Sequence, residues 1–297
     1  MTMNILITGS SGLVGTHLMS VLAASGYKIH RMLRNEADNQ SFFWDPGKGV
    51  IHFDESIRID AVINLAGESI ADGRWSEERK KRILESRESS TLLLSESLAK
   101  LKHKPAVLIS GSAIGYYGDT GTRIVDEDSY QGTGYLAEVS ERWEKATKPA
   151  SDAGIRTVHI RTGVVLSPNG GMLQKMLLPF KMGLGGIVGS GQQYLSWVSI
   201  NDIASMIQFL LENESISGAV NLVSKQPVTN YTFTKTLGSV LNRPTLIPLP
   251  ACVARLVFGE MADALLLSST RVLPKRLAEA GYNFIDVDLN RTLKSLL

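Results

Sequence analysis

Three glycines near the start of the chain constrain its fold more than any other feature. Gly9, Gly12 and Gly15 come directly after the short apolar run NILITG (4–9) and open LVGTHLMSVLAASG (13–26), which has helical spacing and ends in a glycine. In such a turn the first glycine permits a sharp bend, the second lets backbone N–H groups approach a pyrophosphate, and the third lets the helix pack close to the strand. The spacing predicts a dinucleotide-binding turn with contacts from Gly9, Ser10, Gly12, Leu13 and Gly15.

Beyond this turn, apolar runs and helical segments alternate through the first half of the chain. Each apolar run is short and almost wholly apolar, which is typical of strands buried on both faces of a parallel sheet. We expect strands at 27–33, 60–67, 105–112 and 155–166, and helices at 76–102 and 135–153, the second bent near Pro149. The pattern predicts an α/β fold with a Rossmann doubly wound parallel sheet, in a domain over residues 1–165.

The character of the chain changes after residue 166. The segment that follows is rich in glycine, and beyond it we expect a strand at 219–224 and helices at 231–241, 251–258 and 270–280. This predicts a smaller α/β lobe at the C-terminus, residues 166–297, that binds substrate. The segment 198–213 is expected to return to the first domain.

The end of the second strand indicates which dinucleotide binds. An Asp or Glu at this place is usual for NAD, whereas an Arg accommodates the 2′-phosphate of NADP. Arg31 lies within the strand and Arg34 just past it, while Glu36 and Asp38 are close enough to reach a ribose. The alternative for Arg34 is a solvated loop charge. We expect NADP as the cofactor, with NAD as the weaker choice.

A serine ends the strand in LISGSAIGYYGD (108–119). Ligands of parallel sheets bind beside the carboxyl ends of the strands, so Ser112 is placed to hydrogen-bond a substrate carbonyl or hydroxyl. The alternative is a hydroxyl that caps the following turn.

Together these motifs resemble the extended short-chain dehydrogenase/reductase superfamily, and most closely an atypical branch of it, the epimerase family of nucleoside-diphosphate-sugar epimerase type. The resemblance covers nearly the whole chain. It implies a Rossmann domain, an NADP-type cofactor and a C-terminal lobe with a substrate pocket, but no particular substrate. The segments that carry it are NLAGESIADGRW (64–75), ISGSAIGYYGD (109–119), RTGVVLSPNGGML (161–173), PFKMGLGGIVGSGQQYLSWVSINDI (179–203) and VLPKRLAEAGYNF (272–284).

The resemblance also assigns expected roles to individual residues. Gly9, Gly12 and Gly15 match the phosphate-binding glycines, and Arg34 matches the 2′-phosphate position. A loop that lines the adenosine and ribose is matched by Leu65, Ala66 and Gly67. The catalytic Ser/Thr and the catalytic tyrosine of the superfamily are matched by Ser112 and Tyr135.

The segment GYLAEVSERWEK (134–145) departs from the superfamily's Tyr-x-x-x-Lys, because Val139 stands four residues after Tyr135. The lysine lowers the pKa of the tyrosine from about 10 toward neutrality and holds the nicotinamide ribose. Val139 can do neither, and Lys145, which falls about 80° around a helix from Tyr135, is no substitute. The alternative for Tyr135 is a partly buried residue at a helix start.

Two further segments are open to two interpretations. The charges in WSEERKKRILESRESS (75–90) alternate in sign, as on a solvated helix face, and Arg87 is the exception to watch because the branch resemblance includes it. The segment GLGGIVGSGQQ (183–193) is either a lid over the substrate or a purely structural loop.

Composition excludes several classes of protein. A net charge of +2 is too small for a nucleic-acid or anionic-membrane footprint. Cys252 has no partner for an internal disulfide and is expected to be a buried thiol, and the five histidines show no metal-ligand spacing, so we expect no metal site. The absence of a long apolar span or a basic N-terminal segment predicts a cytoplasmic protein, with a small-molecule substrate and a possible homodimer.

Two functions fit these observations. The first is an NADP-dependent oxidoreductase or epimerase that acts on a carbonyl or secondary alcohol, such as that of a nucleotide sugar. The second is a non-enzymatic NADP-binding module that lacks the Tyr-Lys pair. The long glycine-rich segment and Trp197 favour a substrate pocket, and with it the enzyme.

Overall fold

The computed structural model describes residues 2–34, 42–54 and 56–297. Its centre is a six-stranded sheet in the order β12-β8-β6-β5-β1-β2, in which every neighbouring pair is parallel. The chain moves outward from β1 in both directions, so the switch point of the sheet lies beside β1, as in doubly wound folds. The predicted fold class is therefore confirmed. The strands are β1 (Asn4–Thr8), β2 (Lys28–Arg31), β5 (Ala61–Asn64), β6 (Val107–Ala113), β8 (Arg156–Thr162) and β12 (Gly218–Leu222).

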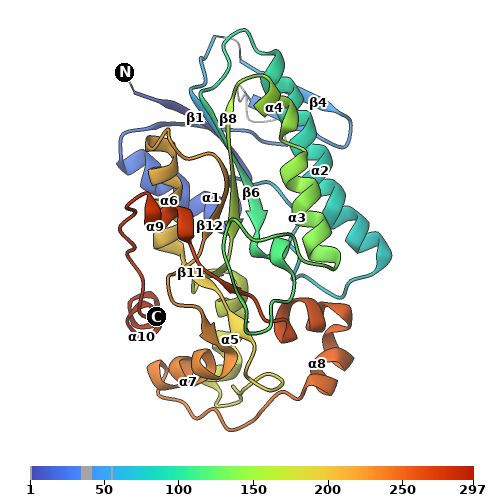
Figure 1. Cartoon of the computed structure of the whole chain (residues 1–297), viewed down its shortest axis with the longest axis vertical. Coiled ribbons are helices and arrows are strands. Elements are labelled where there is room, and N and C mark those ends of the chain that lie inside the picture. Colours follow the sequence, from blue (N-terminus) through green and yellow to red (C-terminus); the bar gives the residue numbers. More distant parts are fainter. Residues whose placement is uncertain (1, 35–41, 55) are drawn as a thin grey trace.

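Helices cover both faces of this sheet (Figure 1). One face carries α1 (Leu13–Ala24) and α6 (Ile200–Glu212), which contact each other. The other carries α2 (Glu77–Lys100), α3 (Tyr135–Lys145) and α4 (Lys148–Asp152). The helix expected at 135–153 is thus interrupted just before Pro149, where a bend was predicted.

The strands are apolar throughout because both of their faces are buried. In β1, Ile5 and Ile7 pack into the core beneath α1 and α6, whereas Leu6 packs into the core beneath α2. All three side chains have no exposed surface. Burial on both faces explains why the sequence shows a continuous apolar run here, without the alternation of a half-exposed strand.

A hairpin formed by β3 (Phe42–Asp45) and β4 (Val50–Phe53) was not predicted. The buried rings of Phe42 and Trp44 pack into the core beneath α2. Aromatic pairing and burial therefore stabilise a segment in which the sequence predicted no strand. Glu36 and Asp38, which were expected near the ribose, lie outside the described residues.

The smaller lobe has its own apolar core, which includes Leu173, Trp197, Phe233 and Leu293. It lies at the lower end of Figure 1, around α5, α7 and α8. Its helices are α5 (Gly171–Lys181), α7 (Asn230–Val240), α8 (Ala251–Phe258) and α10 (Leu289–Leu296). The helix α9 (Lys275–Glu279) instead packs against β12 of the central sheet, with Leu277 in the core beneath α1 and α6. Short strands complete it: β9 (Val164–Leu166) with β11 (Trp197–Ser199), β10 (Tyr194–Leu195) with β13 (Val228–Thr229), and β14 (Arg271–Val272), which pairs with β7 (Ile124–Val125).

Three details differ from the sequence-based expectations. The strand expected at 219–224 within the smaller lobe instead joins the central sheet as β12, because its backbone pairs with β8. The helix expected at 270–280 is only α9, preceded by β14. Cys252 is exposed rather than buried, because Ala254 is the residue of α8 that faces the interior. The division at residue 165 remains a prediction.

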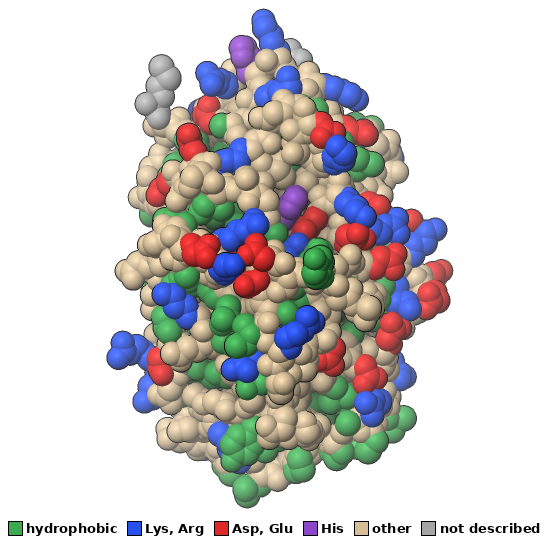
Figure 2. Space-filling view, viewed as in Figure 1, with side chains coloured by type: hydrophobic (Ala, Val, Ile, Leu, Met, Phe, Trp, Pro, Cys, Tyr) green, Lys and Arg blue, Asp and Glu red, His purple; other side chains and the backbone are tan. Residues whose placement is uncertain are grey.

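The face of the molecule shown in Figure 2 has no large region of one charge among the described residues. On the face shown in Figure 2, basic and acidic side chains are interspersed, as the net charge of +2 suggests. Within residues 2–34, 42–54 and 56–297, no helix has both the length and the apolar character needed to cross a membrane.

Candidate functional site

The glycine turn between β1 and α1 has the backbone geometry that the sequence predicts. Gly9 has φ +65°, and a Cβ there would lie 2.6 Å from the carbonyl carbon of Leu65. A Cβ on Gly15 would lie 2.3 Å from the Gly9 carbonyl oxygen. Gly9 therefore lets β1 and the loop after β5 meet, and Gly15 lets α1 approach the turn. At Gly12 the nearest atom to a Cβ is the Gly9 oxygen, at 3.2 Å, so this position is less crowded from within the protein.

The N-terminus of α1 is open toward this turn. Gly12 is its N-cap, no side chain caps it, and its first turn carries no acidic residue. Its leading N–H groups and the helix dipole can therefore receive an anion. Leu13 packs against the smaller lobe, since a Cβ on Gly170 would lie 2.9 Å from a Leu13 methyl carbon. The segment before α5 thus borders the predicted phosphate site.

The end of β2 approaches the same turn through Arg31. Its Nε donates a hydrogen bond to Ser10 Oγ at 3.1 Å. Arg34, the residue predicted to hold a 2′-phosphate, is exposed. Both arginines stand out in the sequence, and Arg34 is the one predicted to hold the 2′-phosphate, whereas the structure ties Arg31 to the glycine turn. Periodicity cannot reveal this contact, because it depends on how β2 lies beside the turn.

A buried polar network supports the loop after β5. Thr8 Oγ1 donates to Asn64 Oδ1 at 2.6 Å, and Asn64 Nδ2 donates to Thr91 Oγ1 at 2.8 Å. The network connects β1 and β5 to α2. It therefore fixes the start of the loop formed by Leu65, Ala66 and Gly67, which is predicted to line the adenosine and the ribose. Ala66 is also held by its backbone N–H, which donates to Thr8 Oγ1 at 3.3 Å.

Ser112, at the end of β6, has an internal partner that the sequence did not suggest. Its hydroxyl donates to Glu144 Oε1 at 2.7 Å, and only 4% of its surface is exposed. Glu144 in turn receives two hydrogen bonds from Arg161, at 2.8 and 2.9 Å. Because the Ser112 proton is directed to a carboxylate, its oxygen is left to act as an acceptor. The Ser112 hydroxyl thus donates to a side chain of α3 and does not cap the following turn, which was the alternative for this serine.

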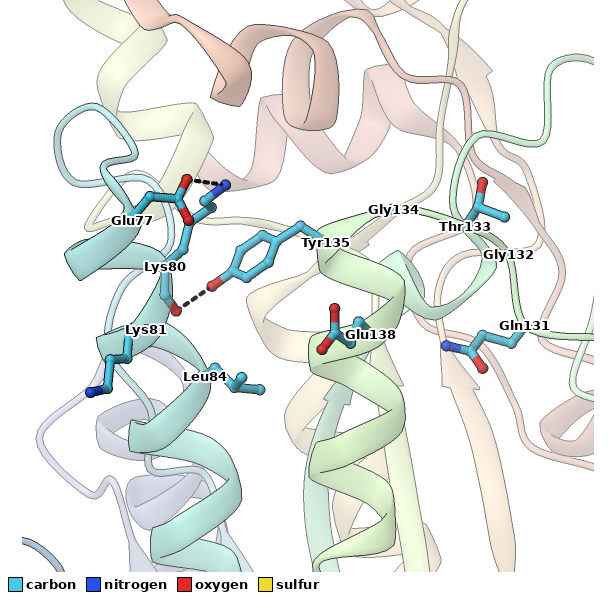
Figure 3. Close-up of a pocket in the computed structure, with 10 residues that line it drawn as sticks. All are labelled: Glu77, Lys80, Lys81, Leu84, Gln131, Gly132, Thr133, Gly134, Tyr135 and Glu138. Atoms are coloured by element: carbon cyan, nitrogen blue, oxygen red, sulfur yellow. Dashed lines mark hydrogen bonds and ion pairs between the residues drawn. The ribbon is translucent and has the colours of Figure 1, made fainter.

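Tyr135 begins α3 and reaches across to α2 (Figure 3). Its hydroxyl donates to the carbonyl oxygen of Lys80 at 2.7 Å, and its ring packs edge-on against Trp75 with centroids 5.1 Å apart. Burial raises the pKa of Tyr135 to about 12, although the charges of Arg87 and Lys80 oppose the shift. The phenol is therefore protonated at neutral pH and suited to act as an acid.

On α3, neither Val139 nor Lys145 places a cation beside Tyr135. Val139 is 4% exposed and buried beneath α3. The side chain of Lys145 is 70% exposed and pairs with Glu141 at 2.6 Å. No ammonium on α3 therefore stands in for the missing lysine.

An open groove of about 720 Å³ lies between the first turns of α2 and α3 and the loop 131–134, and Tyr135 is part of its wall. It carries charges of both signs, and Ser112 is not part of its wall. The groove therefore does not unite the two candidate catalytic hydroxyls, each of which has its own internal partner. Its walls, drawn in Figure 3, are Glu77, Lys80, Lys81, Leu84, Gln131, Gly132, Thr133, Gly134, Tyr135 and Glu138.

Among the described residues, no three His, Cys, Asp or Glu side chains gather as they would around a metal ion. Independence from metals stays a prediction for the whole chain.

Comparisons with known proteins place the chain among relatives of matching length. Residues 5–222 match the NAD dependent epimerase/dehydratase family, and residues 249–296 match a domain of unknown function, DUF1731. Epimerase family protein Mb2239 of Mycobacterium bovis is 44% identical over 94% of this chain and 92% of that protein. The crystal structure of human epimerase family protein SDR39U1 (isoform 2) with NADPH is 34% identical, covers 99% of both chains and has a TM-score of 0.91.

A more distant structure shares the fold alone. A UDP-glucose 4-epimerase of Thermotoga maritima, with UDP-glucose, is 19% identical and has a TM-score of 0.76 over 99% of this chain and 97% of that one.

The doubly wound sheet and the glycine turn at its switch point define a nucleotide-binding protein of the oxidoreductase and epimerase kind. The chain belongs to the NAD dependent epimerase/dehydratase family, that is, to the extended short-chain dehydrogenases/reductases. The predicted family is confirmed.

Proposed function

We propose that the chain is an NADP-dependent oxidoreductase or epimerase that acts on a carbonyl or secondary alcohol, with nucleotide sugars as the first substrate class to test. The observation that carries the proposal is the open N-terminus of α1 beside Gly9 and Gly15, at the switch point of the sheet. The NADPH in the human relative, at a TM-score of 0.91, supports the same assignment. We also propose that the protein is cytoplasmic.

The residues present fit a dinucleotide. The pyrophosphate would lie at the uncapped first turn of α1, near Ser10, Gly12 and Leu13. The adenosine ribose would lie by Leu65, Ala66 and Gly67, and its 2′-phosphate would be held by Arg34 together with Arg31, which already lies at the turn. When bound, NADP(H) supplies hydride chemistry at the nicotinamide C4.

The proposed catalytic residues then have distinct tasks. Ser112, whose proton is directed to Glu144, would accept a hydrogen bond from a substrate hydroxyl and orient it. Tyr135 would exchange a proton with the reacting oxygen. To do so its hydroxyl must leave the carbonyl oxygen of Lys80, which costs about 1 kcal/mol for an ordinary hydrogen bond.

One observation favours the second candidate, a non-enzymatic NADP-binding module. The hydroxyls of Ser112 and Tyr135 are both bonded within the protein, and Val139 removes the usual cation. In this alternative the cofactor would control the binding of a partner.

The test is to incubate the purified protein with NADPH and a panel of carbonyl compounds and nucleotide sugars. We would follow NADPH absorbance and, by NMR, the configuration of each sugar. Turnover that Tyr135→Phe slows supports the enzyme. NADPH binding with no absorbance change and no new sugar across the panel would reject it in favour of the binding module.

A further inference from the structure

Arg87 is a half-buried cation at the edge of the sheet where ligands of this fold bind. It lies on the side of α2 that faces the loop after β5. Its Nη1 donates to the carbonyl oxygen of Ile83, one turn earlier in the same helix, at 3.0 Å. Arg87 forms no ion pair with any carboxylate in the described ranges, whereas the neighbouring Arg79 and Arg82 both lie within 4.0 Å of Glu68.

Two neighbours hold the guanidinium in place. A Cβ on Gly67 would lie 3.2 Å from Arg87 Cζ, so the glycine makes room for the side chain. On the other side, Arg87 Cζ lies 5.0 Å from the ring centre of Trp143, within range of a cation–π contact.

Trp143 is itself fixed. Its Nε1 donates to Thr91 Oγ1 at 3.0 Å, and its ring fills the space that a Cβ on Gly111 would occupy, 2.6 Å away. Arg87 therefore lies on a rigid platform that spans β6, α3 and α2. A side chain ordered in this way loses little further entropy when it acts on a neighbour.

The platform continues the face of α3 that carries the altered motif. Tyr135, Val139 and Trp143 are four residues apart, so they lie along one side of the helix. Val139 occupies the place of the superfamily's lysine and is buried. Arg87 Nη1 donates to the carbonyl oxygen of Ile83, and the Tyr135 hydroxyl donates to the carbonyl oxygen of Lys80, about one turn earlier in α2. The guanidinium thus brings a positive charge from α2 to the side of α3 where position 139 brings none.

We propose that Arg87 supplies from α2 the positive charge that a lysine at position 139 would supply from α3, and that it acts on the Tyr135 phenol as a positioning residue. Its catalytic importance rests on the proposed function, but its effect on the phenol does not.

The electrostatics agree with this geometry. Burial lowers the pKa of Arg87 to about 10, with opposing effects from Tyr135 and Glu68, so the guanidinium is still charged at neutral pH. The charge of Arg87 lowers the pKa of Tyr135 against burial, and so does that of Lys80, whose Nζ lies 5.7 Å from the centre of the Tyr135 ring. Glu260 and Glu138 act in the opposite direction. Glu77 forms an ion pair with Lys80 at 2.8 Å, so its negative charge offsets the positive charge of Lys80.

The test titrates the phenol directly. Tyrosines are replaced by 3,5-difluorotyrosine, whose phenol ionises several pH units lower, so that residue 135 titrates while Arg87, with a pKa of about 10, keeps its charge. ¹⁹F NMR follows each resonance, with Tyr135→Phe to assign the signal. Arg87→Gln should raise the pKa of residue 135 by about one unit, the low end for an opposite charge nearby. Arg87→Lys should keep most of the effect. Arg82→Gln, on the exposed side of the same helix, is the matched control and should leave the pKa unchanged.

Two outcomes would overturn the inference: an unmoved pKa in Arg87→Gln, or an equal rise in Arg87→Lys, which would make packing the cause. If Arg87→Gln does not fold, Gly67→Val decides, because its Cβ would already lie 3.2 Å from Arg87 Cζ and its two methyl groups need more room, so the guanidinium must move without being deleted. A raised pKa then supports the inference and an unmoved one rejects it. The titration needs neither cofactor nor turnover, so its result is independent of whether the protein is an enzyme.

Discussion

The phenol of Tyr135 is tied to α2 by a hydrogen bond to the carbonyl oxygen of Lys80, at 2.7 Å. Burial raises the pKa of this phenol to about 12. In the folded protein the neutral form therefore persists to a higher pH than in the unfolded chain, where the pKa is about 10. Any stability that this group contributes is present below pH 10 and is lost as the pH rises through about 12.

We predict that Tyr135→Phe slows hydride transfer in the reductive direction by about 10²-fold, the lower end for general acid assistance. NADPH affinity should stay nearly the same, because the hydroxyl is bonded to Lys80. Stopped-flow NADPH oxidation with a reactive carbonyl, measured across pH, gives the rate. An unchanged rate profile would make Tyr135 a packing residue.

Gly12 and Gly15 should respond differently to substitution. Gly12→Val should keep the fold and abolish dinucleotide binding, because φ −74° suits a branched residue while its side chain would block the pyrophosphate. Gly15→Val should instead destabilise the protein, since its Cβ would lie 2.3 Å from the Gly9 oxygen. Thermal melting by circular dichroism and calorimetric titration with NADPH separate the two effects. NADPH binding that survives in folded Gly12→Val would place the phosphates elsewhere.

NADPH should bind more tightly than NADH because of the arginines near the end of β2. Arg34→Ala and Arg31→Ala should each weaken NADPH binding by about 10-fold or more, the loss of a charge-assisted hydrogen bond, with little effect on NADH. Arg58→Ala is the control, since that side chain is 74% exposed and, among the described residues, forms an ion pair with Asp60 alone. Calorimetry with both cofactors is the measurement, and equal affinities in the unaltered protein would end the NADP assignment.

The sequence predicted the parts of this structure that local spacing determines. Gly9 and Gly15 identified the turn, and the run around Ile5 identified a strand buried on both faces, because each pattern lies within a dozen residues. The contacts of Ser112 with Glu144 and of Arg31 with Ser10 were not predicted. They join residues on different elements, so they depend on how those elements pack.

His159 should make the protein less stable in mild acid. Burial lowers its pKa, and its Nε2 lies 2.8 Å from Thr147 Oγ1. The unfolded chain takes up the proton first, near pH 6.5, so the stability due to the neutral ring is present above that pH and is lost as the pH falls toward the lower folded pKa.

The free energy of unfolding should therefore fall by up to about 1.4 kcal/mol per pH unit below pH 6.5 through this group. His159→Gln should show a shallower slope in urea unfolding between pH 7 and pH 5. His103→Gln, at an exposed position, is the control and should retain the original slope. Parallel slopes for all three proteins would show that His159 does not titrate between the two states.

Val139→Lys tests whether a lysine at position 139 restores the Tyr-x-x-x-Lys pair of the superfamily. Position 139 is 4% exposed, so an ammonium there must lose its hydration, and Arg87 already brings a like charge to the same face. We expect Val139→Lys to lower the stability of the protein. If its ammonium reaches the phenol, the pKa of Tyr135 falls and the pH optimum for alcohol oxidation moves down.

Combining Val139→Lys with Arg87→Gln should lessen the loss of stability, because it removes the repulsion between two cations in one small space. Val139→Leu, which changes shape without charge, is the matched control for packing. Urea unfolding and the pH profile of alcohol oxidation are measured for the unaltered protein, the two single variants, the double variant and Val139→Leu. If the double variant is no more stable than the sum of its single changes predicts, the charges at 87 and 139 do not share a site, and Arg87 cannot replace the lysine.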